Sequence, residues 1–164
     1  MSTPSIERLS VLIVEPSPQM ASLVASMLRT LRIRLIQDCA DAKSAGRLVQ
    51  TRAFDVIIID DATPPIGGVG FVKGLRGSTD SPSRQAAVIM MSSAPDTANI
   101  IAARDAGVTE FLRKPFATDH LRTRLVSIVS RPRDFVESPA YVGPDRRRRE
   151  QGPEGEERRA PKPD

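Results

Sequence analysis

The chain has 164 residues, a net charge of +4, 40% hydrophobic residues and only 4% aromatic residues, with no Trp. This length allows one domain and a tail, and the domain's core must be aliphatic. The apolar runs are too short to span a bilayer, the N-terminus lacks the charged-then-apolar layout of a secretory signal, and the single Cys39 excludes an intramolecular disulfide. We therefore expect a cytoplasmic protein without membrane insertion.

Short apolar runs alternate with amphipathic stretches along the first 130 residues. The runs predict strands at 9–14, 33–36, 56–59, 88–91 and 110–112, the third and fourth buried on both faces. The stretches between them predict helices at 17–29, 41–50, 69–76 and 96–106, with Gly107 as a C-cap, and a last helix with Thr118 as its N-cap. Five such units predict an α/β fold, a doubly wound five-stranded parallel sheet with its site at the carboxyl ends of the strands.

The composition changes after the last helix, which Arg131-Pro132 ends. Residues 131–164 are rich in Pro, Gly, Arg and Glu, and almost no apolar residue follows Val142. Such a segment buries too little surface to offset its chain entropy, so we expect it to be disordered when free. The sequence thus predicts a domain at 1–130 and an arginine-rich, intrinsically disordered tail at 131–164.

Four motifs at the ends of the predicted strands resemble those of CheY-like (flavodoxin-like) response-regulator receiver domains. They are Glu15 after the first strand, the run from Phe54 to Asp60 with Pro64 and Gly67-Gly68 beyond it, Ser92-Ser93-Ala94, and Lys114-Pro115-Phe116. Phe111 falls where this family carries its rotating aromatic residue. The resemblance covers residues 9–130. It implies a switching module in two-component signalling, with a histidine kinase as a possible partner, and not a metabolic enzyme.

The resemblance also implies a role for each of these residues. Asp60 would accept a phosphoryl group, Lys114 would neutralise a phosphoryl oxygen, and Ser92 would be the hydroxyl that moves in the switch. Mg²⁺ would be held by Glu15, Asp60 and the backbone carbonyl of Ala62.

One position departs from the family pattern. The family has two adjacent acids after the first strand, and this chain has Glu15-Pro16. Pro16 has no side-chain oxygen, and Asp61 is expected to point away from Asp60 along an extended backbone. Because Mg²⁺ requires near-octahedral oxygen ligands, we expect weak magnesium binding. A degenerate receiver that keeps the fold without using phosphorylation is the alternative interpretation.

The tail contains Arg131, Arg133 and the run Tyr141-Val142-Gly143-Pro144-Asp145-Arg146-Arg147-Arg148-Arg149. A solvated basic run and nonspecific nucleic-acid contact are two interpretations. The second is disfavoured by four glutamates that follow the run. A third starts from chemistry: Arg reads the O6/N7 edge of guanine and pairs with phosphate, Tyr stacks, and a carboxylate accepts from the opposite guanine edge. Gly143-Pro144 would set the turn between Tyr141 and Asp145.

A receiver followed by this run is similar to the CheY-like c-di-GMP effectors (Cle group) of alphaproteobacteria. The resemblance implies that Arg131, Arg133, Tyr141, Gly143, Pro144, Asp145, Arg146, Arg147, Arg148 and Arg149 bind cyclic di-GMP. It further implies control of docking on a flagellar motor switch protein of the FliM type, at the flagellated pole or in surface attachment. The docking face would carry Arg104, Arg113, Arg122 and Arg124. A conventional phosphorylated receiver with an inert tail, and a nucleic-acid-associated protein, remain as alternatives.

Overall fold

The computed structural model describes residues 5–147. Its centre is a sheet of five parallel strands in the order β2-β1-β3-β4-β5. The strands are β1 (Ser10–Val14), β2 (Leu35–Cys39), β3 (Val56–Asp60), β4 (Ala87–Ser92) and β5 (Glu110–Arg113). This architecture confirms the predicted α/β fold and its flavodoxin-like strand order.

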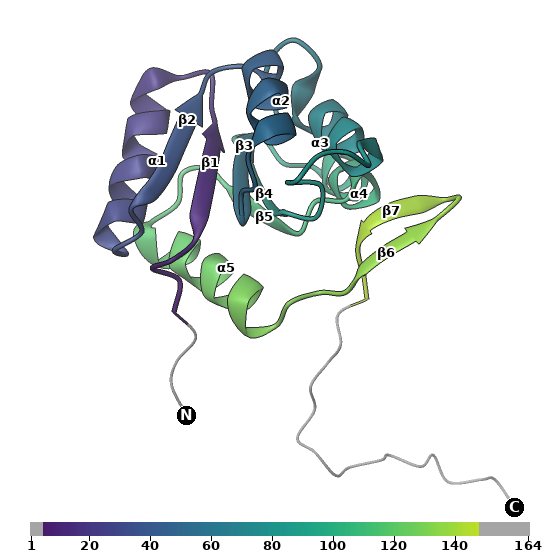
Figure 1. Ribbon diagram of the computed structural model, residues 1–164. Helices are drawn as coiled ribbons and strands as arrows, with labels where there is room; N and C mark the ends of the chain where they lie inside the picture. Colours follow the sequence, from purple (N-terminus) through teal and green to yellow (C-terminus); the bar gives the residue numbers. More distant parts are fainter. Residues whose placement is uncertain (1–4, 148–164) are drawn as a thin grey trace, which may run out of the picture.

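Helices cover both faces of the sheet (Figure 1). The helices α1 (Pro18–Thr30) and α5 (Thr118–Ser130) pack on one face, and α2 (Ala42–Thr51), α3 (Gly67–Gly77) and α4 (Thr97–Ala106) pack on the other. No helix within residues 5–147 is both long enough and apolar enough to cross a membrane.

The core has two aliphatic layers because successive strand residues point to opposite faces. Leu12 and Ile57 pack toward α2, α3 and α4, whereas Val11 and Val56 pack toward α1 and α5. All five residues of β3 are buried, and so are all but the first of β4. The two strands predicted to be buried on both faces are therefore confirmed.

The helix starts follow from side-chain caps. Ser17, Asp41 and Asp96 each accept a hydrogen bond from the backbone N–H three residues further on. Gly107 ends α4 with a left-handed φ of 106°, as predicted. The prediction for Thr118 was wrong: Ala117 is the N-cap of α5, and the Nδ1 of His120 accepts from its backbone N–H at 3.0 Å.

The structure differs from the sequence prediction after α5. The strands β6 (Phe135–Ser138) and β7 (Tyr141–Pro144) form an antiparallel hairpin beside α4 (Figure 1), where the sequence predicts disorder. Tyr141 is only 8% exposed. The composition argument failed here because few apolar atoms suffice when the domain supplies the rest of the contact surface. Residues 148–164 of the predicted tail lie outside the described residues.

A buried arginine anchors the hairpin to the domain. The guanidinium of Arg76, which α3 contributes, donates to the backbone carbonyls of Gly107 and Arg84 and lies 5.6 Å from the ring centroid of Phe135. Burial lowers the pKa of Arg76 to about 10, so this cation stays charged at neutral pH. Gly143 fits between the Tyr141 hydroxyl and Gly107, where a Cβ would lie 2.7 Å and 2.9 Å from them. The hairpin therefore depends on specific contacts and not on a large apolar surface.

Candidate functional site at the carboxyl edge of the sheet

The predicted receiver residues meet at the carboxyl ends of four strands. Glu15 follows β1, Asp60 ends β3, Ser92 ends β4 and Lys114 follows β5. The backbone extends the sheet into the site, since the N–H of Glu15 donates to Cys39 and the N–H of Lys114 donates to Ser92. Parallel pairing thus positions all four side chains at one edge.

Lys114 joins the two carboxylates. Its Nζ lies 2.5 Å from Asp60 Oδ2 and 2.7 Å from Glu15 Oε2. Glu15 is 3% exposed and Asp60 is 5% exposed. Burial acts to lower the pKa of Lys114, but the hydrogen bonds and the negative charges of Asp60 and Glu15 outweigh it and raise the pKa. The ammonium group therefore remains charged.

The backbone around Asp60 holds its other carboxylate oxygen. The N–H of Ala62 donates to Asp60 Oδ1 at 2.9 Å, and the hydroxyl of the fully buried Thr63 donates to the Asp60 carbonyl at 2.7 Å. The Lys114–Pro115 peptide bond is cis. These contacts fix the Asp60 carboxylate in one orientation.

Asp61 contacts the site through Ser92, a contact that the sequence analysis did not predict. The hydroxyl of Ser92 donates to Asp61 Oδ2 at 2.6 Å. β3 ends at Asp60 and Asp61 lies in the turn that follows, which places its carboxylate beside Ser92. A carboxylate placed directly after a strand end is the sequence signal that identifies such a residue.

The residues of the site do not fit a tightly held magnesium ion. Glu15 and Asp60 both turn toward Lys114, and Pro16 contributes no oxygen from its side chain. Within residues 5–147 no three His, Cys, Asp or Glu side chains are grouped so that they could hold a metal ion. The Ala62 carbonyl, the remaining predicted donor, does not replace the missing carboxylate.

Phe111 lies in β5 at the edge of the core. Its ring is half-buried and packs against the layer under α2, α3 and α4. Its carbonyl accepts from Nε of Arg124 at 3.2 Å. Arg124 is therefore committed to the domain, and of the four predicted docking arginines only Arg104, Arg113 and Arg122 are exposed.

A buried carboxylate beside a fixed ammonium group can attack phosphorus, because the ammonium offsets negative charge on the phosphoryl oxygens. The receiver family model matches residues 11–126. The chain belongs to the response regulator receiver family. Receiver domains act as signalling modules and not as metabolic enzymes, in agreement with the sequence prediction.

Curated relatives are similar over the same region. The transcriptional regulatory protein KdpE of Mycobacterium tuberculosis is 31% identical over 127 residues, which cover 74% of this chain and 51% of KdpE. The chemotaxis protein CheY-3 of Vibrio cholerae is 27% identical over 125 residues, which cover 76% of this chain and 95% of CheY-3. The chain thus spans about half the length of KdpE, and CheY-3 matches over nearly its whole length.

Two solved receiver structures have the same fold. The receiver domain of the Francisella response regulator 1452 has a TM-score of 0.68 and 27% identity over 76% of this chain and 98% of its own. The receiver domain of the sensor histidine kinase PA1611 of Pseudomonas aeruginosa, solved with magnesium coordinated in its active-site cleft, has a TM-score of 0.65 and 24% identity over 74% of this chain and 97% of its own.

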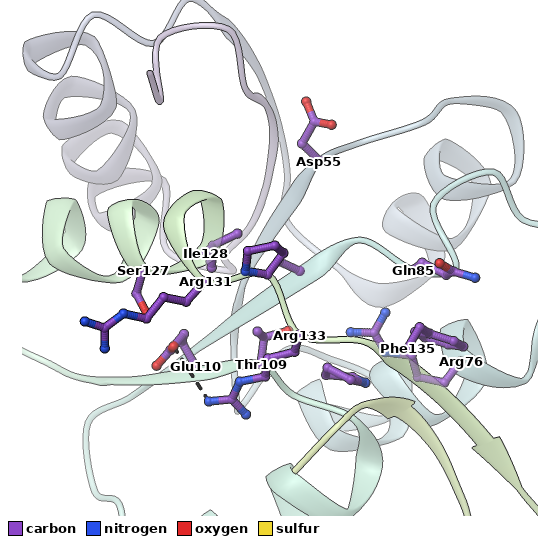
Figure 2. Close-up of a pocket in the computed structure, with 13 residues that line it drawn as sticks. Asp55, Arg76, Gln85, Thr109, Glu110, Ser127, Ile128, Arg131, Arg133 and Phe135 are labelled. Atoms are coloured by element: carbon purple, nitrogen blue, oxygen red, sulfur yellow. Dashed lines mark ion pairs between the residues drawn. The ribbon is translucent and has the colours of Figure 1, made fainter. Parts of the chain in front are cut away.

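The tail residues fall into two groups. Arg131, Arg133 and Pro144 line a cavity at the opposite edge of the sheet from Asp60 (Figure 2). Tyr141 and Arg146 face α4: the Arg146 guanidinium lies 4.3 Å from the Tyr141 ring centroid and 2.6 Å from Asp105 Oδ1.

The predicted turn at Gly143-Pro144 needs correction, whereas the predicted ligand contacts of the other tail residues remain predictions. Gly143 and Pro144 belong to β7 and do not form the predicted turn, because Pro144 pairs with Phe135 in the hairpin. Asp145 accepts from the N–H of Arg147 at 2.9 Å. Arg148 and Arg149 lie outside the described residues.

Proposed function

We propose that this receiver is a response regulator whose arginine-bearing C-terminal segment binds cyclic di-GMP and thereby controls docking on a partner protein. The observation that supports this proposal most strongly is the ion pair between Arg146 and Asp105. It attaches the start of the arginine run to α4. A ligand that binds the Arg146 guanidinium in place of Asp105 would therefore alter the contact between the hairpin and α4.

The exposed groups of the segment suit a doubly charged guanine dinucleotide. Arg146 and Arg147 are exposed and can pair with phosphate or with guanine O6 and N7. Asp145 can accept from the N1 and N2 hydrogens of guanine. Arg146 covers the ring of Tyr141, so stacking of a base on Tyr141 requires Arg146 to leave Asp105 first. Ligand binding and release of α4 would then be one event.

The partner would be a flagellar motor switch protein of the FliM type, bound in the cytoplasm at the flagellated pole or during surface attachment. The exposed Arg104, Arg113 and Arg122 would attract an acidic and apolar segment of that partner. Because Arg104 also approaches the backbone of Arg146, with an Nη2–O distance of 3.5 Å, the arginine segment borders this face.

Calorimetric titration of the full chain with cyclic di-GMP tests the proposal, with GTP and short DNA as comparison ligands. We expect binding of cyclic di-GMP, weak binding of GTP and loss of most affinity in Asp145→Ala. In Asp105→Asn we expect stronger binding, because Arg146 no longer has a competing carboxylate. A plain basic tail would bind GTP and DNA comparably and would lose affinity gradually with each arginine removed, which would contradict the proposal.

A second candidate function is conventional phosphorylation of Asp60 by a histidine kinase. The contact between Lys114 and the buried Asp60 favours it, because that ammonium can neutralise an added phosphoryl group while Ser92 hydrogen-bonds it. Glu15 would retain one carboxylate near a weakly bound Mg²⁺. Labelling by a small phosphodonor, absent in Asp60→Asn, tests this function independently of the tail.

A further inference from the structure

The structure contains a cavity of about 230 Å³ between the end of α5 and the hairpin. It lies where β4 and β5 begin, at the edge of the sheet opposite Asp60. Figure 2 shows Ser127, Arg131 and Glu110 on one side and Arg76, Gln85 and Phe135 on the other. The connector from Arg131 to Phe135 forms one wall, so the docked hairpin completes the cavity.

Several charged groups of the cavity are already committed. The Asp55 carboxylate accepts from the N–H of Ser10 at 2.8 Å, and Arg76 is bonded to backbone carbonyls. Glu110 lies between two arginines and forms a long ion pair with each, at 3.9 Å from Arg133 Nη2 (Figure 2) and at 4.0 Å from Arg124 Nε. Arg131 is exposed, and its side chain has no ion pair or hydrogen bond within the described part of the chain. Two cations and one carboxylate are thus free to rearrange around a ligand.

This combination of signs restricts the ligand. A site for phosphate alone would not place Glu110 beside the arginines, because a carboxylate repels an anion. Guanine offers both complements: its N1 and N2 hydrogens suit a carboxylate, and its O6 and N7 suit an arginine. Phe135, Ile128 and Pro144 add apolar wall for the base. A drug-sized ligand fills a pocket of roughly 300 Å³ or more, so this cavity has room for one base and not for a whole dinucleotide.

We infer that this cavity is the subsite for one guanine of cyclic di-GMP, with Glu110 on the N1/N2 edge and Arg131 and Arg133 on the O6/N7 edge or the adjoining phosphate. The inference rests on the proposed function and assigns it a second half-site. The other guanine remains for Asp145 and Arg147, which follow Pro144 within three residues and so lie within about 11 Å of it along the chain. Ligand binding therefore connects the end of α5 to the arginine run.

The decisive experiment compares cyclic di-GMP with cyclic di-AMP by calorimetry on the full chain. Adenine has no N1 hydrogen and no N2 amino group, so a carboxylate at Glu110 favours guanine. We expect Glu110→Gln to weaken cyclic di-GMP binding about tenfold or more and to narrow the preference over cyclic di-AMP. Arg131→Ala should weaken the binding of cyclic di-GMP to a similar extent. Arg47→Ala removes an equal charge from an exposed position of α2 outside the cavity, and it should bind like the wild type.

Amide spectra of the same samples provide a second measurement. We expect ligand-dependent shifts at Gln85 and Thr109, which line the cavity and belong to neither the tail nor the receiver site. If the wild type binds cyclic di-GMP while Glu110→Gln and Arg131→Ala retain full affinity and selectivity, the subsite assignment is wrong and the proposed function stands. If the wild type does not bind cyclic di-GMP, both are overturned.

Discussion

The hydroxyl of Ser92 donates its hydrogen to Asp61, at an Oγ–Oδ2 distance of 2.6 Å. Ser92 is 1% exposed and Asp61 is half-buried, so this hydrogen bond to a carboxylate is partly shielded from water. If Ser92 is the hydroxyl that responds to a phosphoryl group on Asp60, it must first break this bond. Asp61 therefore stabilises the resting state of the switch.

Replacement of Asp61 by Ala should make the switch easier to activate. A hydrogen bond to a charged group contributes about 1.5–3 kcal/mol, so we expect the variant to bind beryllofluoride at Asp60 roughly tenfold more tightly. The measurement is fluorine NMR of the bound phosphoryl analogue in the presence of Mg²⁺. Ser92→Ala provides the matched control because it lacks the hydroxyl. In a Ser92→Ala background, the added Asp61→Ala substitution should not tighten beryllofluoride binding further. Equal affinity in wild type and Asp61→Ala would show that the contact does not restrain Ser92.

Replacement of Pro16 by Asp should strengthen magnesium binding. The wild type has Glu15 and Asp60 as its carboxylate donors, and both contact Lys114, so we expect weak Mg²⁺ binding and slow labelling of Asp60 by small phosphodonors. An added carboxylate at position 16 should tighten Mg²⁺ binding and speed labelling. Titration calorimetry and a phosphodonor assay measure these changes, with Asp60→Asn as the unlabelled control. Wild-type labelling as fast as that of Pro16→Asp would show that Pro16 does not limit magnesium binding or phosphorylation of Asp60.

The sequence predicts the main part of this site because strand ends bring its residues together. Asp60 and Lys114 are 54 positions apart, yet each lies at the end of an apolar run, and parallel pairing places such ends at one edge. The boundaries were less accurate at β2, where the prediction of 33–36 differs from Leu35–Cys39. β2 is an edge strand, so it tolerates polar residues such as Asp38. These polar residues interrupt the apolar run from which the strand was predicted.

The hairpin could not be predicted from its own composition. Its stability comes from contacts with distant residues: Arg76 from α3, Arg84, which precedes β4, and Gly107 at the end of α4. When an arginine lies on an apolar helix face, its guanidinium is expected to reach solvent, but the Arg76 residue is only 2% exposed. Local periodicity does not reveal which carbonyls and rings will surround such a cation, so the anchor becomes visible only in three dimensions.

Charge reversal at Arg113 and Arg122 should abolish binding of an acidic partner segment of the FliM type. Both side chains are exposed and make no hydrogen bond or ion pair within residues 5–147, so the double variant should remain folded. Arg124 is unsuitable for this test because it donates to the Phe111 carbonyl. Binding is measured by calorimetry with the partner peptide, and Arg47→Glu on α2 is the control of equal charge change. Retained binding in the double variant would place the interface on another face.

Replacement of Gly143 by Ala should detach the hairpin without unfolding the sheet. The new Cβ would lie 2.7 Å from the Tyr141 hydroxyl oxygen and 2.9 Å from the Cα of Gly107. Overpacking of this kind costs about 1–3 kcal/mol. We expect faster amide hydrogen exchange at Tyr141, Val142 and Gly143 and unchanged exchange in β3. Gly46→Ala, whose Cβ would meet no atom within 4 Å, is the matched control. Normal protection of β7 in Gly143→Ala would mean that the hairpin adapts without detaching.

Tyr141 provides a direct measure of hairpin docking because it is the only tyrosine and the chain has no Trp. Burial raises its pKa, and the positive charges of Arg76, Arg146 and Arg133 only partly oppose this. Its hydroxyl donates to the Pro144 carbonyl at 2.6 Å, a bond that the phenolate cannot make. Ultraviolet titration should therefore give a pKa above the usual value of about 10, and Gly143→Ala should return it toward that value.

The sign of the linked effect follows from proton release. Above pH 10 or so, the detached hairpin ionises its tyrosine before the docked one does. The detached form then binds fewer protons, so docking stability falls as the pH rises through this window. Below this pH window, both forms carry the neutral phenol, so Tyr141 contributes no pH dependence to docking. Hydrogen exchange of β7 measured on both sides of the window checks the direction, and Tyr141→Phe, which cannot ionise, should lose the dependence. An ordinary tyrosine pKa in the wild type, with β7 protected, would show that the phenol is exposed in the docked hairpin.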